Sequence, residues 1–161
     1  MTKPQTQKLK NETDPFIPDI KILVGVSLTD FSCYWKIDPY ATKKMKVTQG
    51  FNNLPDCKQD IEDIVKALAY YDVHDDEGKL RLAEPKYAEI VACSNYITNH
   101  FCAANPDKNV LIIWAVAGHG MVLGARQAVV LNDIDKRYNF YKLWRIEEHI
   151  RLQADRYTNS Y

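Results

Sequence analysis

The sequence has no net charge and no long apolar run, and each absence excludes a class of protein. Its 21 lysine and arginine residues balance 21 aspartate and glutamate residues, so it lacks the charge signature of binding to nucleic acid or to anionic membranes. The longest apolar run, Val110–Ala117, is far shorter than the roughly 20 residues that cross a bilayer. Because the N-terminus is polar and has no signal-peptide core, we expect a cytoplasmic protein.

Paired cysteine motifs are also missing. The four cysteines show no CxxC spacing and the four histidines are scattered, which gives little support for a structural zinc site. An extracellular disulfide scaffold does not fit this pattern either. Three of the cysteines lie among apolar neighbours in stretches of helical periodicity, and we expect buried, reduced thiols at Cys57, Cys93 and Cys102.

Glycine and proline are scarce, with 6 and 7 residues, whereas 46% of the residues are apolar. This is the composition of a folded domain, and a chain of this length supports one core rather than two. Residues 1–18 are polar, carry three prolines and show no apolar periodicity, which predicts a flexible leader. We therefore expect one domain over residues 19–161.

Two stretches predict strands that are covered on both faces. Ile20–Ser27 is rich in β-branched residues without alternation, and Val110–Ala117 is continuously apolar, which is typical of buried parallel strands. A shorter strand is predicted at Ala128–Leu131. The region from Phe31 to Asn53 is predicted as a long loop with some strand near Met45–Val47.

Apolar residues at helical spacing predict three helices. The first begins near Pro55 and runs to Leu68, and the second extends from Pro85 to Ala104. The third has one apolar face, formed by Phe140, Leu143, Ile146 and Ile150. This succession predicts an α/β fold in which a mostly parallel sheet has helices on both faces.

The tripeptide Gly118-His119-Gly120 follows the most apolar segment of the chain. In open α/β sheets, ligands bind beyond the carboxyl ends of the strands. Two flanking glycines would leave the imidazole and the Gly120 N–H uncovered, which suits a general base beside an oxyanion donor. Two other interpretations stay open: an exposed turn without a function, and a phosphate cradle with Gly124, although that glycine is one position late for a dinucleotide fingerprint.

The run Leu111–Gly120, LIIWAVAGHG, carries the sharpest part of a family resemblance. Together with the helix that contains LPDCKQD (residues 54–60), with Asn132 and with a helix ending at residues 159–161, it resembles the caspase-like cysteine peptidases. This group includes the metacaspases and the paracaspases. The resemblance spans roughly Ile20 to Tyr161 and implies a caspase-like three-layer sandwich.

The resemblance assigns roles to three residues. His119 matches the catalytic base, and Gly120 matches the residue whose backbone N–H lines the oxyanion hole, so the implied activity is that of a cysteine-type endopeptidase acting on polypeptides. Asp60 matches an acidic residue that metacaspases and paracaspases place in the pocket for the side chain before the cut, which would favour arginine or lysine there. The alternative for Asp60 is a solvated helix residue.

The sequence departs from the family at the nucleophile. Family members carry the catalytic cysteine about 50 residues after the histidine, whereas 161 − 119 = 42 residues follow His119. Among the upstream cysteines, only Cys33 lies in a predicted loop that could approach the strand ends, and its neighbours offer nothing to lower its pKa. We therefore expect a C-terminally incomplete catalytic domain that is inactive alone.

A missing strand would also leave an apolar sheet edge unpaired, which predicts self-association or pairing with another chain. The alternative function is therefore a non-catalytic pseudo-peptidase that regulates a complete relative. No cofactor is expected except for calcium, which metacaspases often need. An acidic cluster lacks the spacing of a known calcium loop but has the right oxygen ligands: Asp72, Asp75, Asp76 and Glu77.

Overall fold

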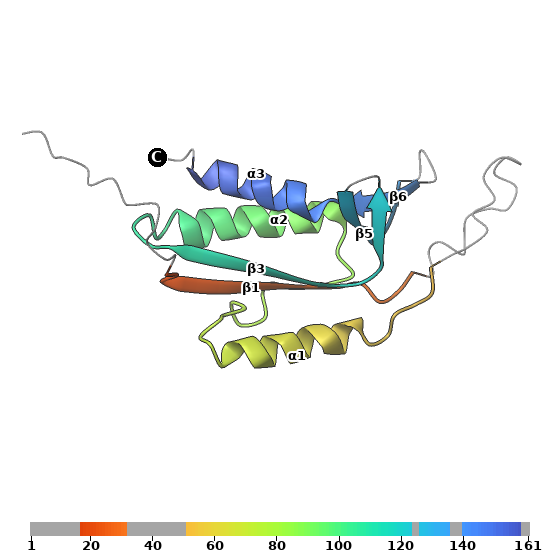
Figure 1. Ribbon diagram of the computed structural model, residues 1–161, viewed down its shortest axis with the longest axis horizontal. Coiled ribbons are helices and arrows are strands. Elements are labelled where there is room, and N and C mark those ends of the chain that lie inside the picture. The colour runs from red at the N-terminus through yellow and green to blue at the C-terminus, as the bar shows by residue number, and fades with distance from the viewer. Residues whose placement is uncertain (1–16, 32–50, 124–125, 136–139, 159–161) are drawn as a thin grey trace, which may run out of the picture.

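A three-stranded sheet forms the centre of the protein (Figure 1). The computed structural model describes residues 17–31, 51–123, 126–135 and 140–158. Within them, β1 (Ile20–Ser27) lies between β2 (Arg81–Ala83) and β3 (Val110–Ala117), and all three strands are parallel. Most of the predicted leader, Cys33 and the strand content predicted near Met45–Val47 lie outside the described residues.

β1 is the central strand because its residues are apolar toward both faces. Every residue from Ile22 to Ser27 is buried, and β1 pairs with β3 over its whole length, from Ile20 opposite Val110 to Ser27 opposite Ala117. Both segments are confirmed as parallel strands, and the predicted burial is confirmed for β1. β2 has only three residues, which are too few to show a period in the sequence.

Helices cover both faces of the sheet (Figure 1). α1 (Cys57–Ala69) lies on one face, and α2 (Tyr87–Ile97) and α3 (Ile146–Thr158) lie on the other. The second predicted helix is thus confirmed, although its last turn is a π-helix, η2 (Thr98–Cys102). None of the helices in the described part of the chain is long and apolar enough to cross a membrane. The predicted α/β fold is confirmed at this level.

A second, antiparallel sheet replaces part of the last predicted helix. Its strands, in spatial order, are β4 (Gly120–Leu123), β5 (Arg126–Asp135) and β6 (Phe140–Trp144). The prediction that Phe140 and Leu143 lie on a helix is wrong, because both residues pair with β5 as part of β6. α3 begins only at Ile146. The strand predicted at Ala128–Leu131 is confirmed as the middle of β5.

β3 forms one edge of the parallel sheet. The sequence predicts a buried strand, but all eight residues of β3 are only partly buried, because no described strand pairs with its outer edge. Its alternate residues still pack against the core: Val110, Ile112, Trp114 and Val116. An apolar strand with an open backbone edge is a favoured place for another strand to pair.

Candidate active site

The carboxyl ends of the parallel strands lie together at one end of the sheet, where α1 also begins (Figure 1). We call this end of the sheet the His119 edge, as distinct from the outer edge of β3. Gly118-His119-Gly120 follows β3 at this edge, where the sequence predicts it. The Leu28 N–H donates to the backbone oxygen of Ala117 at 2.9 Å. A Cβ atom on Gly118 would lie 3.0 Å from the Cβ of Leu28, so glycine lets the chain leaving β3 pass close to the chain leaving β1.

The His119 imidazole has three partners at this edge. Its Nε2 lies 2.8 Å from the backbone oxygen of Asn52, and the rings of Phe31 and Phe51 contact it at centroid distances of 4.6 and 4.9 Å. Because a carbonyl oxygen only accepts hydrogen bonds, Nε2 carries the proton that this bond uses. In the neutral ring, Nδ1 is then the nitrogen that can accept a proton, as a general base must.

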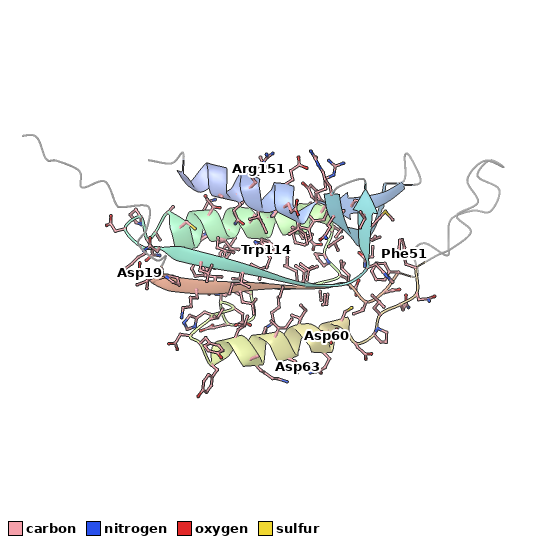
Figure 2. All side chains as sticks on the ribbon, in the orientation of Figure 1. Asp19, Phe51, Asp60, Asp63, Trp114 and Arg151 are labelled. Carbon is pink, nitrogen blue, oxygen red and sulfur yellow. The ribbon has the colours of Figure 1, made fainter. Side chains whose placement is uncertain are left out.

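Two hydrogen bonds hold the partners of His119 together. The Phe31 N–H donates to Oδ1 of Asn53 at 2.8 Å, and the Leu54 N–H donates to the backbone oxygen of Thr29 at 2.8 Å. These bonds join the chain that leaves β1 to the segment that enters α1, where Phe51 lies (Figure 2). The imidazole is therefore positioned by two segments that are far apart in the sequence.

The backbone N–H of Gly120 points away from β5. The Val130 N–H donates to the backbone oxygen of His119 at 2.9 Å, so the next pair along the hairpin, Gly120 opposite Val129, is the one whose N–H groups face outward. A Cβ atom on Gly120 would have no neighbour within 4 Å. An N–H that faces away from β5, next to an oriented imidazole, is suited to act as an oxyanion donor beside a base.

Glu84 joins several chain segments at this edge, and no role for it is predicted from the sequence. Its Oε1 accepts hydrogen bonds from the backbone N–H of Thr29 at 2.5 Å, from the Thr29 hydroxyl and from the N–H of Asp30 at 3.1 Å. Its Oε2 accepts one from the Asn132 amide at 2.6 Å. No local pattern marks Glu84, because Thr29 and Asn132 lie 55 and 48 positions away.

The described cysteines are free and buried, as predicted: Cys57, Cys93 and Cys102. Burial raises the pKa of the Cys93 thiol to about 11, and it also raises the pKa of Cys102. Burial, followed by the charges of Asp60 and Glu84, raises the pKa of Cys57. Since the thiolate is the nucleophilic form, none of the three is suited to act as the partner of His119.

Asp60 lies in the first turn of α1 with its side chain exposed (Figure 2). α1 begins at the edge that carries His119, so Asp60 lies on the end of the helix nearest to it. Within the described ranges, no ion pair involves Asp60. Its binding of a basic side chain stays a prediction, and the alternative of a solvated helix residue fits the same exposure.

Two carboxylates of the acidic turn after α1 interact with other side chains of the fold. Asp75 forms an ion pair with Arg81, and Asp76 accepts a hydrogen bond from the Tyr96 hydroxyl at 2.8 Å. Over the residues that the structure describes, no group of three or more His, Cys, Asp or Glu side chains is arranged to hold a metal ion. A need for calcium stays a prediction of the resemblance.

A second histidine, His149, lies between α2 and α3, away from this edge. Its Nε2 is 2.5 Å from the Oγ of Ser94, and the His149 ring packs at steep angles against Trp114 and Trp144. Ser94 is only 6% exposed and lies within α2, so its Oγ is closed to a substrate. The pair contributes to the packing of α3 on α2.

The edge around His119 holds an oriented imidazole and an outward backbone N–H, which are the kinds of group that serve as base and oxyanion donor in acyl transfer. Comparison with known proteins gives no match to a family model, to a curated protein or to a solved structure. The function must therefore be argued from the groups at this edge.

Proposed function

We propose that this chain supplies the histidine and the oxyanion donor of a caspase-like cysteine endopeptidase. The observation that carries the proposal is the pairing of an imidazole held through Nε2 by Asn52 with the outward N–H of Gly120. In the reaction, Nδ1 of His119 takes the proton of a cysteine thiol, and the thiolate attacks the peptide carbonyl. The Gly120 N–H then stabilises the negative charge that develops on the carbonyl oxygen.

The cysteine comes, in this proposal, from a strand that pairs with the outer edge of β3. The partial burial of all eight β3 residues supports this, since β1, which has neighbours on both sides, buries six of its eight. A parallel strand there would end beside Ala117, and the residue after it would lie next to His119. α3 runs back toward the amino end of β3 (Figure 1), which is where such a strand begins in a crossover connection.

Asp60 is the proposed determinant of cleavage after arginine or lysine. Its support is its place on the first turn of α1, at the end of the helix that lies at the His119 edge. An exposed carboxylate there can pair with a basic substrate side chain. Asp63, one turn further along the same helix and also exposed, provides a matched control (Figure 2).

The test is hydrolysis of fluorogenic peptides with arginine, lysine or aspartate before the cleaved bond. The chain alone should be inactive, and the chain extended by a cysteine-bearing strand that pairs with the outer edge of β3 should cleave after arginine or lysine. His119→Ala should lower kcat/KM of the extended protein about 100-fold or more. Asp60→Asn should raise KM for basic substrates, whereas Asp63→Asn should not. Full activity of the His119→Ala variant would overturn the proposal.

The second candidate is a non-catalytic partner of a complete peptidase. It is favoured by the raised pKa of the described cysteines and by the open edge of β3. In this case β3 pairs with a strand of another chain. Co-purification of a peptidase with the native protein supports this candidate, and isolation of a stable monomer contradicts it.

A further inference from the structure

An apolar hollow lined by Gly120, the residue after His119, has no role in the proposed chemistry so far. It has a volume of about 290 Å³ and lies between β4, β5 and the start of α3. Gly120 forms one end, and Val122, Val129 and Ile146 contribute apolar surface. Val122 is 70% exposed, which leaves its apolar side chain available to a ligand.

In the described part of the chain, no strand pairs with the outer edge of β4, whose residues line this hollow. β4 is the outer strand of the small sheet, and Gly120 and Val122 are its outward-facing residues, because Met121 lies between them in the alternating ladder with β5. An extended polypeptide can pair with such an edge through main-chain hydrogen bonds. Its side chain next to Val122 then lies on the same face as Val122, over the hollow.

Three arginines lie beyond the hollow, around a second cavity of about 220 Å³: Arg126, Arg145 and Arg151. Gln127 and Glu147 line both cavities, so the two lie side by side. Arg145 pairs with Glu148 at 3.6 Å, whereas in the described part of the chain neither Arg126 nor Arg151 has an ion-pair partner. Arg151 lies on α3 (Figure 2).

We propose that this groove, from Gly120 to Arg151, binds an acidic, extended stretch of polypeptide. An apolar side chain fills the hollow, and a glutamate or aspartate further along binds Arg126 and Arg151, because guanidinium groups pair with carboxylates. Arg126 lies opposite Leu123, three residues from Gly120, which is about 10 Å along a strand. In the bound peptide, the acidic residue therefore lies three or four positions from the residue whose carbonyl oxygen accepts a hydrogen bond from the Gly120 N–H.

This inference rests on the proposed function in one respect, since it takes the peptide at Gly120 to be the substrate. Peptide binding itself needs no nucleophile, so it can be measured on the present chain by fluorescence anisotropy. The probe is a labelled peptide with a leucine followed by glutamate at the stated spacing, and the comparison peptide has glutamine in place of that glutamate. We expect at least tenfold tighter binding of the acidic peptide, weakening as salt is raised.

Variants with exposed side chains test the arginines directly. The pair Arg126→Gln and Arg151→Gln should abolish the preference for glutamate, and Glu147→Gln should strengthen acidic-peptide binding two- to threefold. Lys108→Gln removes one positive charge before the amino end of β3 and should change nothing. Equal binding of the two peptides, or competition by inorganic phosphate at the same concentration as the acidic peptide, would overturn the proposal.

The peptidase proposal and this one fail separately. If acidic peptides bind through the arginines but the extended protein cleaves no peptide, the result supports the binding groove and contradicts the peptidase proposal. If the extended protein cleaves peptides and the double arginine variant leaves its substrate preference unchanged, the groove is refuted.

Discussion

Replacing Glu84 tests whether one carboxylate organises the edge that carries His119. Glu84→Gln keeps the size of the side chain but removes its charge and one acceptor oxygen. The new amide nitrogen must then face either the Thr29 and Asp30 donors or the Asn132 amide, which are both donor sites. At least one of the four hydrogen bonds is lost, and the others weaken because the acceptor is neutral.

The magnitude follows from the type of bond. A hydrogen bond to a charged group contributes about 1.5–3 kcal/mol, and a neutral one about 0.5–1.5 kcal/mol. Because the four bonds share one partly exposed carboxylate, they do not add in full, and we expect Glu84→Gln to lower the free energy of unfolding by about 2–3 kcal/mol. Glu84→Gly should be less harmful than Glu84→Ala by about 1 kcal/mol, since Glu84 has φ +52° and glycine adopts this conformation without strain.

The assay is urea unfolding followed by tryptophan fluorescence and circular dichroism, with the slope checked for two-state behaviour. Glu77→Gln is the matched control, because Glu77 is exposed and has a similar φ of +55°, and it should change stability by less than about 0.5 kcal/mol. If Glu84→Gln and Glu77→Gln behave alike, the carboxylate does not hold this edge.

Three further predictions concern the strand ends and the thiols. Gly25→Ala should destabilise the fold by about 1–3 kcal/mol, because its Cβ would lie 2.5 Å from Cγ2 of Ile61, whereas Gly120→Ala should be near neutral to stability, with no neighbour within 4 Å; equal unfolding midpoints would contradict this. At pH 8, Cys93 should be alkylated at least about 100-fold more slowly in the folded protein than in urea, because its pKa rises from 9.0 to about 11 and less thiolate forms. The alkylation rate of the folded protein should increase as the pH approaches 11. Mass spectrometry of the peptide that contains Cys93 measures both rates. Nitrogen NMR of neutral His119 should show a protonated Nε2 and an unprotonated Nδ1, and the opposite tautomer would refute the bond to Asn52.

Long, uniform patterns made much of the fold predictable. β1 and β3 are continuous apolar runs, and α1 carries an apolar stripe, so each element is specified by its own residues. The end of β3 then locates His119 without further information. The spacing of three between Phe140 and Leu143 predicts a helix, but pairing with β5 decides the outcome.

The environment of His119 was not predictable in the same way. Asn52 lies 67 positions from His119, and its backbone oxygen carries no signature of residue type. Glu84 likewise acts through partners about 50 positions away. The partial burial of β3 depends on which strand lies beside it, and a strand's own sequence does not determine its neighbours.

The partners of His119 nevertheless bear on the interpretations of Gly118-His119-Gly120. An exposed turn without a function needs no fixed imidazole, and a phosphate cradle needs backbone N–H groups at a helix N-terminus, whereas β4 follows here. A backbone oxygen and two aromatic rings instead orient a ring that stays partly exposed. Order combined with access is what proton transfer to a neighbouring group requires, and it is the strongest structural argument for placing a nucleophile beside this histidine.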